Sequence, residues 1–196
     1  MKIPWKKLKF FDEGKRGQIY QWKKGKTILM VKVKKPESKA YGRIENEYNV
    51  LKVLNKKGIG PRVKAGSAEY LVYEYVPGKR IGDVLATTKN PKLILKKVLE
   101  QCFTLDQMKF SKEEMHNPYK HILVNKNKVV MIDFERCHKT DKPKNVSQFC
   151  QYILNRAEKL EEKGIKISRE KVMQAIKRYK KAQSKENFQK LMQMLF

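Results

Sequence analysis

The chain has 196 residues, 40% of them hydrophobic, a length that suits one domain or two small lobes with a real core. Its 46 Lys and Arg against 20 Asp and Glu give a formal charge of +26, which favours a polyanionic partner such as nucleic acid. No stretch is long and apolar enough to span a membrane, and residues 1–10 lack an apolar signal core. We therefore expect a cytoplasmic protein without a membrane partner, and a monomer is the simplest oligomeric state.

The charge has one compositional alternative, and the cysteines indicate the redox state. A lysine-rich proteome also raises the charge, although glutamate usually rises with lysine in such proteomes and here the acids lag behind. The three cysteines, Cys102, Cys137 and Cys150, have no paired spacing, which indicates reduced and mostly buried thiols and argues against a zinc site.

The first part of the chain is predicted to be β-rich with a single helix. Alternating apolar residues favour strands over 9–11, 18–22 and 27–33, and apolar residues at spacings of three and four predict a helix over 40–57. Gly58 to Pro61 ends that helix, and two further strands are expected near 62–65 and 70–75. Pro77 and Gly78 then form the most probable boundary between two lobes.

The second part is predicted to be mostly helical, with a small hairpin. Helices are expected over 81–85, 91–108, 145–163, 168–182 and 184–195, with Ser168 and Ser184 as N-caps. Short strands over 122–124 and 129–132 flank a turn. The fold class is therefore α+β, with a β-rich domain over 1–76 and a helical domain over 77–196.

Segment 12–19, DEGKRGQI, lies between two predicted strands. Gly14 and Gly17 match the second and third glycines of a kinase phosphate loop, with Lys15 between them and Ile19 at the position of the loop's valine. Asp12 replaces the first glycine. An ordinary hairpin turn is the alternative, so this match alone is weak.

Three further segments match the nucleotide-binding parts of a kinase. Lys32 ends the tripeptide Met-Val-Lys on a strand, where an ammonium would meet the α- and β-phosphates, and Lys34 is its rival two residues on. Glu47 lies on the following helix, where it would orient the strand lysine. Segment 71–78, LVYEYVPG, resembles a hinge in which the Glu74 carbonyl and the Val76 N–H would hold adenine, beside Tyr73.

Segment 116–135, HNPYKHILVNKNKVVMIDFE, has the layout of a kinase catalytic loop followed by its metal-binding aspartate. Asp133 is the expected Mg²⁺ ligand, because Mg²⁺ prefers carboxylate oxygen. His116 and His121 occupy the positions of the catalytic Asp and the metal-binding Asn. A neutral imidazole accepts a hydroxyl proton near pH 7, so His116 is a candidate base, and Lys120 would stabilise the transferring phosphoryl group.

Together these motifs resemble the small atypical kinases of archaea that are related to the RIO kinases and to the kinase of the KEOPS complex. The marks are GKRG at 14–17, VKVKKPES at 31–38, GRIENE at 42–47, GIGP at 58–61, HNPYKHI at 116–122 and IDFER at 132–136. The similarity is greatest to the archaeal tRNA kinase family. It implies a minimal two-lobed protein-kinase-like fold lacking the peptide-binding subdomain, with ATP and Mg²⁺ as cofactors.

The resemblance further implies a tRNA partner, with phosphorylation of the ribose 2′-hydroxyl of a uridine in the variable loop and an association with heat tolerance. No Ala-Pro-Glu follows Asp133, so the usual platform for a peptide substrate is missing. An atypical serine/threonine protein kinase acting on a translation or tRNA-modification partner is the alternative. A non-catalytic RNA-binding pseudokinase is a third possibility.

Overall fold

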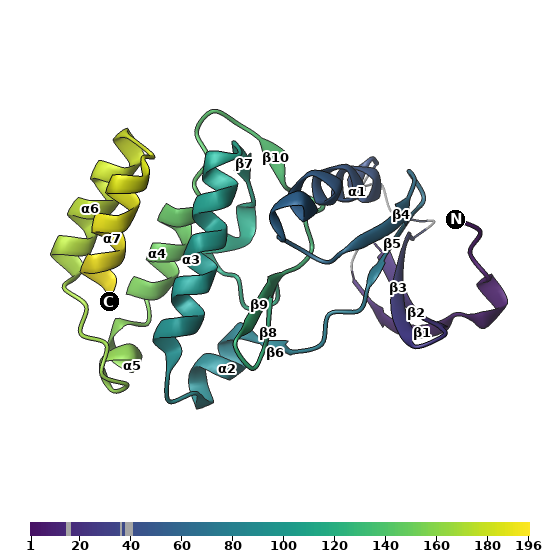
Figure 1. Ribbon diagram of the computed structural model, residues 1–196, viewed down its shortest axis with the longest axis horizontal. Coiled ribbons are helices and arrows are strands. Elements are labelled where there is room, and N and C mark those ends of the chain that lie inside the picture. Colours follow the sequence, from purple (N-terminus) through teal and green to yellow (C-terminus); the bar gives the residue numbers. More distant parts are fainter. Residues whose placement is uncertain (15–16, 36, 38–40) are drawn as a thin grey trace. The chain divides into compact units, whose positions relative to one another are not determined.

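The computed structural model describes residues 1–14, 17–35, 37 and 41–196. The protein is α+β, and the chain divides into two compact units (Figure 1). Unit 1 comprises Met1–Pro77 and Val130–Cys137, and unit 2 comprises Gly78–Val129 and His138–Phe196. Within the described residues, no helix has the length and apolar character needed to cross a membrane.

Unit 1 is built on an antiparallel five-stranded sheet of order β1-β2-β3-β5-β4. The strands are β1 (Lys9–Glu13), β2 (Gly17–Lys24), β3 (Thr27–Lys34), β4 (Val63–Gly66) and β5 (Tyr70–Glu74). Because side chains alternate across a strand, β3 sends Leu29 and Val31 to one face and Lys32 to the other. Leu29 and Val31 pack in a core cluster that Ile3 of the N-terminal segment joins.

Helix α1 (Arg43–Leu54) packs against β3, β4 and β5. It begins after Gly42, whose positive φ of 69° breaks the preceding chain, and a 3₁₀ turn (Asn55–Lys57) extends it to Gly58. The Asn55 side chain then donates to the carbonyls of Ile59 and Pro61 and accepts from the Val63 N–H. One side chain therefore fixes the connection from α1 to β4.

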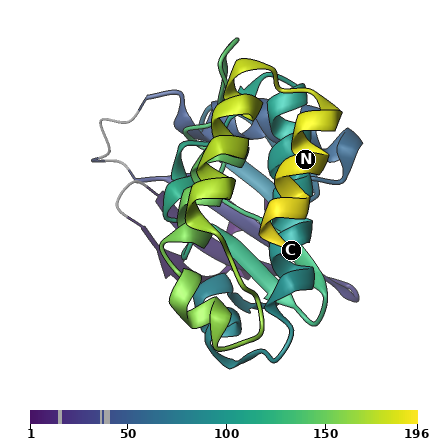
Figure 2. The same ribbon diagram turned by 90° about the vertical axis from the view of Figure 1, so that its left-hand side faces the viewer.

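Unit 2 is mainly helical. It contains α2 (Ile81–Thr87), α3 (Pro91–Gln107), α4 (Asn145–Leu154), α5 (Ala157–Glu161), α6 (Arg169–Lys181) and α7 (Lys185–Leu195). Helices α6 and α7 lie side by side in both views (Figures 1 and 2). The Phe103 and Phe188 rings stack at 4.3 Å between centroids, and the Tyr179 ring lies beside both, so aromatic contacts join α3, α6 and α7.

Short strands complete unit 2. Strand β6 (Lys79–Arg80) pairs with β8 (Ile122–Asn125), and β9 (Lys128–Met131) follows β8 in the same sheet and carries the chain into unit 1. Strand β7 (Phe110–Ser111) pairs with β10 (His138–Lys139). These two-residue strands β6, β7 and β10 have no periodicity of their own, and the sequence pattern did not predict them.

A buried carboxylate connects the helices of unit 2. Asp106, near the end of α3, is 1% exposed. Its oxygens accept hydrogen bonds from the N–H and amide nitrogen of Asn145, from the Val146 N–H and from the Tyr179 hydroxyl. The N–H groups of Asn145 and Val146 belong to the first turn of α4, so Asp106 takes the place of an N-cap supplied by another helix.

Two helix predictions need correction. The expected helix over 145–163 is two helices, because the Arg156 N–H bonds the Ile153 carbonyl and its guanidinium stacks on the Tyr152 ring at 3.7 Å and donates to the Tyr152 carbonyl. Those contacts replace the regular helical pattern at this point. Ser184 accepts from the Asn187 N–H and caps α7 as predicted, whereas Ser168 precedes α6 without a side-chain cap bond.

Candidate functional site

The central feature of unit 1 is a lysine surrounded by three carboxylates. The Lys32 Nζ lies 2.7 Å from Glu47 Oε2, 3.1 Å from Asp133 Oδ1 and 3.3 Å from Glu135 Oε2. The Glu47 side chain is 4% exposed and that of Asp133 is 37% exposed. The cluster therefore has a buried side, formed by Glu47, and a side that solvent or a ligand reaches, formed by Asp133.

The charge state of the cluster follows from its geometry. Burial alone would lower the pKa of the Lys32 ammonium, but the negative charges of Glu47, Asp133 and Glu135 outweigh burial and raise that pKa well above its ordinary value. Lys32 is therefore a fixed cation across the physiological range of pH. A permanently charged ammonium held in one place is what binding of phosphate oxygens requires.

One face of α1 holds the segment that carries Asp133. The Glu47 carboxylate bonds Lys32 through Oε2 and accepts from the Phe134 N–H through Oε1 at 2.9 Å. The adjacent Asn46 amide donates to the carbonyls of Glu135 and Cys137, and one turn earlier Arg43 donates to the Glu135 carbonyl. Arg43, Asn46 and Glu47 fall on one face because helical positions three and four apart are neighbours.

Phe134 anchors the same segment by packing. Its side chain is fully buried, and a Cβ added to Gly60 would lie 3.1 Å from the Phe134 ring and 2.4 Å from Leu51. Gly60 also has a φ of 79°, which disfavours a side chain. The motif GIGP at 58–61 thus leaves space for Phe134, while Asp133 itself adopts a φ of 61° next to the cluster.

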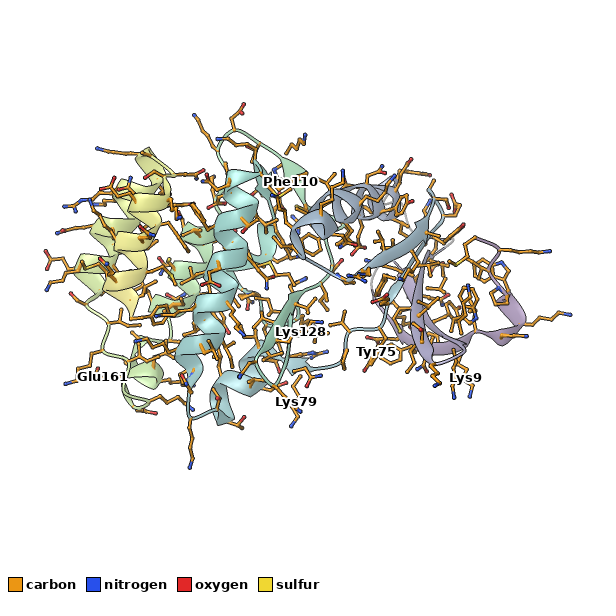
Figure 3. The ribbon with its side chains drawn as sticks, in the orientation of Figure 1. Lys9, Tyr75, Lys79, Phe110, Lys128 and Glu161 are labelled. Carbon is orange, nitrogen blue, oxygen red and sulfur yellow. The ribbon has the colours of Figure 1, made fainter. Side chains whose placement is uncertain are left out.

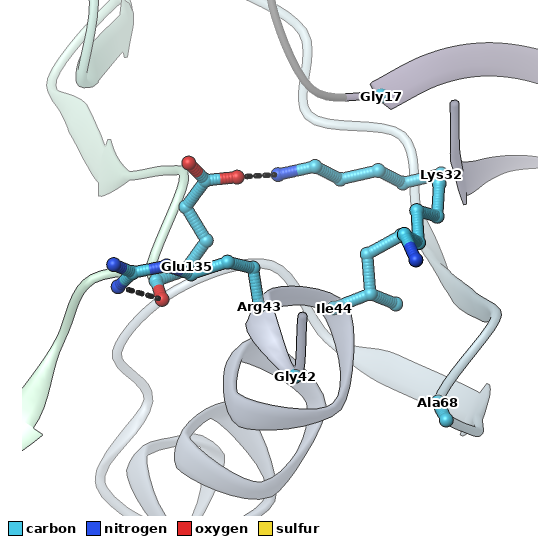
Figure 4. Close-up of a pocket in the computed structure, with 8 residues that line it drawn as sticks. Gly17, Lys32, Gly42, Arg43, Ile44, Ala68 and Glu135 are labelled. Atoms are coloured by element: carbon cyan, nitrogen blue, oxygen red, sulfur yellow. Dashed lines mark hydrogen bonds and ion pairs between the residues drawn. The ribbon is translucent and has the colours of Figure 1, made fainter. Parts of the chain in front are cut away.

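A small pocket lies beside the lysine (Figure 4). Lys32 and Glu135 point toward each other across it, and Arg43 lies next to Glu135 from the first turn of α1. Its lining residues are Gly17, Lys32, Lys34, Gly42, Arg43, Ile44, Ala68 and Glu135. Three of the four charged residues among them are cations, so the pocket suits an anionic group.

Of the predicted phosphate-loop residues, the Gly14 N–H donates to the Gly17 carbonyl at 2.9 Å. Lys15 lies outside the described residues. Ile19 is opposite Lys32 in the β2–β3 register. Gly17 is buried, and a Cβ there would meet the Val33 carbonyl oxygen at 2.9 Å, so β2 and β3 approach closely where the loop ends.

We expect Gly17→Ala to destabilise the protein by roughly 1–3 kcal/mol, because the added methyl group pushes β2 away from the Val33 carbonyl. Gly14→Ala is the matched control, since its Cβ would have 4.0 Å to the nearest atom, and it should change stability by less than about 0.5 kcal/mol. Thermal unfolding followed by circular dichroism compares the two variants. Equal melting temperatures would show that the close approach is unimportant.

The hinge-like segment lies at the end of β5. The Glu74 N–H donates to the Arg62 carbonyl, and the Glu74 carboxylate pairs with Lys64 at 2.6 Å. In the described part of the chain, the Val76 N–H makes no hydrogen bond, which leaves a donor available. Burial, followed by the charge of Glu47, raises the pKa of the Tyr73 phenol, so Tyr73 stays neutral.

The histidine loop belongs to unit 2. His116 ends the 3₁₀ turn Glu113–His116 and is exposed, and its Nδ1 lies 3.1 Å from the Glu113 carbonyl oxygen. A carbonyl oxygen only accepts, so this contact places the proton on Nδ1. In the neutral imidazole, Nε2 then carries the lone pair and is the atom able to accept a proton.

Packing on both sides fixes the position of this loop. Met115 is fully buried, and the Tyr119 hydroxyl donates to Asp83 at 2.7 Å. Lys120 is exposed, whereas His121 is half-buried and its N–H bonds the Pro118 carbonyl. The three predicted residues His116, Lys120 and His121 therefore share one short, anchored loop.

The predicted site residues thus form two groups. Lys32, Glu47 and Asp133 meet in unit 1, and His116, Lys120 and His121 lie together in unit 2. Lys34 does not join the carboxylates, because its ammonium lies 4.4 Å from the Tyr41 ring centroid. Sequence reasoning missed Glu135 as a cluster member and missed Asn46 and Arg43. Asn46 and Glu47 were visible as polar helix residues, but their hydrogen-bond partners at residues 134–137 are far away in sequence.

The donor atoms of the cluster suit Mg²⁺ only in combination with a nucleotide. Among the described residues, no group of three or more His, Cys, Asp and Glu side chains is arranged to hold a metal alone. Mg²⁺ in nucleotide sites, however, is usually bound by one or two carboxylates together with substrate phosphates. Asp133 and Glu135, both within 3.3 Å of Lys32 Nζ, supply such a pair of hard oxygen donors beside a cation.

No protein-family model matches the sequence, and no curated protein matches it.

Proposed function

We propose that this protein is an ATP-dependent kinase of minimal two-lobed architecture that phosphorylates a ribose 2′-hydroxyl of a uridine in the tRNA variable loop. The observation that carries the proposal is the fixed Lys32 ammonium between buried Glu47 and accessible Asp133. Catalysis of phosphoryl transfer consists mainly of positioning and charge stabilisation. A permanent cation held by a buried carboxylate, next to a carboxylate open to a metal ion, suits that requirement.

The nucleotide would be held by residues of unit 1. Lys32 would bind phosphate oxygens, the backbone near Gly14 and Gly17 would approach the phosphates, and the free Val76 N–H would donate to the adenine edge. Asp133, with Glu135, would hold Mg²⁺, which when bound neutralises charge on the phosphates. Glu47 positions Lys32 and, through the Phe134 N–H, the segment that carries Asp133.

The acceptor would be activated by unit 2. His116 with its proton on Nδ1 has Nε2 available to accept the proton of a ribose hydroxyl. The exposed Lys120 ammonium would stabilise negative charge on the transferring phosphoryl group, and His121 would contact phosphate or acceptor. A histidine in place of aspartate is consistent with a hydroxyl acceptor, since either group can accept a hydroxyl proton.

Charge supports RNA as the acceptor. The chain carries +26, and the solvent face of α6 presents Lys177, Arg178, Lys180 and Lys181, all exposed. Contacts of such residues with phosphates supply most of the sequence-independent affinity for nucleic acid. The 2′-hydroxyl and the variable loop come from the sequence resemblance, and the loop fits because flexible RNA exposes its 2′-hydroxyls.

We expect His116→Ala to lower kcat for RNA phosphorylation by about 10²-fold, because proton transfer to the base is lost. Affinity for ATP should be unchanged, since the nucleotide residues lie in unit 1. Single-turnover kinetics at saturating ATP measures the effect, with the exposed His138→Ala as a control that should retain full activity. Full kcat in His116→Ala would remove His116 from the role of base.

Incubation of the purified protein with γ-labelled ATP, Mg²⁺ and total tRNA tests the proposal. Label should enter tRNA, and alkali should release it in a dinucleotide, because a phosphorylated 2′-oxygen cannot attack the adjacent phosphodiester. Asp133→Asn should abolish the transfer. Label that alkali releases only in mononucleotides would exclude the 2′-hydroxyl of an internal nucleotide as the acceptor.

A further inference from the structure

Unit 1 has a second concave region, whose lining includes neither Lys32 nor its three carboxylates. It is a hollow of about 440 Å³ lined by Trp5, Leu8, Tyr20, Val33, Lys34, Glu69 and Tyr70. Four of these residues, Leu8, Tyr20, Val33 and Tyr70, also pack against the core cluster of Leu29 and Val31. The floor of the hollow is therefore the sheet face that α1 does not cover.

Trp5 is the unusual member of this hollow. Its side chain is 57% exposed, although tryptophan is the largest apolar side chain and usually finds cover. The backbone holds it in position: the Trp5 N–H bonds the Ile3 carbonyl, the Leu8 N–H bonds the Trp5 carbonyl, and Ile3 is buried in the core. An indole ring is thus presented to solvent on a fixed turn, at the edge of an aromatic floor.

Lysines lie next to Trp5 along the chain, and Lys34 lines the hollow. Lys6 and Lys7 are exposed in the same 3₁₀ turn as Trp5, and Lys9 follows on β1 (Figure 3). Residues 1–11 contain four lysines and no acidic residue. Phe10 and Phe11 of β1 are 60% and 49% exposed, and the Phe10 ring meets Tyr20 edge-on at 6.0 Å between centroids.

We infer that the hollow binds an unpaired nucleobase of single-stranded RNA, with Trp5 stacking on the base and Lys6 and Lys7 contacting the adjacent phosphates. Proteins that hold single strands combine aromatic platforms with a basic surface in this way. The exposed Glu69 carboxylate at the rim can accept from an exocyclic amine or a base N–H. The inference concerns binding alone and holds whether or not the chain transfers phosphate.

Charge favours RNA over the other occupants of an aromatic hollow. A basic rim repels a basic peptide and a second copy of this +26 chain. Attachment to an anionic membrane normally uses a helix with a broad apolar face, whereas the segment here is a three-residue turn followed by a strand. An extended strand of nucleotides supplies flat rings that stack on this aromatic surface and negative charges that its lysines attract.

Intrinsic fluorescence tests the inference with little ambiguity. The chain has two tryptophans, and Trp22 is 7% exposed, so titration with a single-stranded 12-nucleotide oligouridine should quench the Trp5 emission and leave that of Trp22 unchanged. Trp5→Leu should lose the quenching and weaken binding, measured by anisotropy of labelled oligouridine, by at least about 5-fold. Trp5→Phe should remain within about 2-fold, and Phe196→Ala of unit 2 serves as an aromatic control with unchanged affinity.

Three results would overturn the inference. Unchanged oligouridine affinity in Trp5→Leu would show that the indole does not stack on a base. Equal Trp5 quenching by polyglutamate or by duplex RNA would show that charge alone draws the polyanion. Tighter, Trp5-dependent binding to anionic phospholipid vesicles would assign the hollow to a membrane surface instead. Because no ATP is present, none of these outcomes depends on the kinase proposal.

Discussion

Lys32→Ala is expected to lower kcat for phosphoryl transfer by at least about 10³-fold, since a positioned cation on the transferring group contributes that much in related reactions. The substitution also leaves Glu47, Asp133 and Glu135 without the cation that they share. Three adjacent carboxylates would repel the phosphates of a nucleotide. Lys32→Ala should therefore weaken ATP binding as well as catalysis, and both are measured by single-turnover kinetics across a range of ATP concentrations.

Lys34→Ala is the matched control, because Lys34 lies on the same strand face, where its ammonium contacts the Tyr41 ring and, among the described residues, pairs with no carboxylate. It should retain kcat within about 3-fold. Circular dichroism of both variants separates loss of chemistry from loss of fold. If Lys34→Ala loses activity and Lys32→Ala keeps it, the assignment of the strand lysine is wrong, and with it the role of Glu47.

Asp106→Ala is expected to destabilise unit 2 more than any single surface change, by roughly 3–5 kcal/mol. Four donors lose their acceptor inside the protein: the N–H and amide of Asn145, the Val146 N–H and the Tyr179 hydroxyl. Urea unfolding gives the free energy of unfolding. The exposed Asp141→Ala is the control and should change it by less than about 0.5 kcal/mol. Equal stability of Asp106→Ala and the parent would show that water satisfies these donors.

The same residue predicts a dependence of stability on pH. Burial raises the pKa of the Asp106 carboxyl, and hydrogen bonds from Asn145 and Tyr179 only partly oppose this. A carboxyl whose folded pKa is raised stabilises the fold below its unfolded value of about 3.9 and loses that contribution as pH rises through the folded pKa. The stability advantage of the parent over Asp106→Asn should therefore be larger at pH 4 than at pH 7. An advantage that grows with pH would contradict this direction.

The larger elements could be predicted because their patterns are local. Alternating apolar residues marked β2 and β3, and spacings of three and four marked α1, α3 and α6 to within a few residues. The strand predicted over 129–132 is β9, and its observed bounds are Lys128–Met131. The bounds differ by one residue because a run of apolar residues does not fix its own ends. The break after Leu154 was missed because it depends on how Arg156 packs on Tyr152.

The site was harder to predict from sequence than the larger elements, because its residues are far apart along the chain. Lys32 and Glu47 are fifteen residues apart, and Asp133 is a further 86 residues on, so only a known motif indicated that they meet. Glu135 stands where a kinase has glycine, and nothing local showed that its carboxylate turns back to Lys32. Asp106 carried no signal at all, because a single aspartate on a helix is usually exposed, and its hydrogen-bond partners lie on two other helices, α4 and α6.

The most direct test of the central claim offers both acceptors in one reaction. Purified protein, γ-labelled ATP and Mg²⁺ are incubated with total tRNA and total protein extract, and the label is separated by phase extraction, with Lys32→Ala as the inactive control. The account predicts that label enters the tRNA fraction and that Lys32→Ala abolishes it. Label confined to protein, or transfer to tRNA that persists in Lys32→Ala, would contradict it.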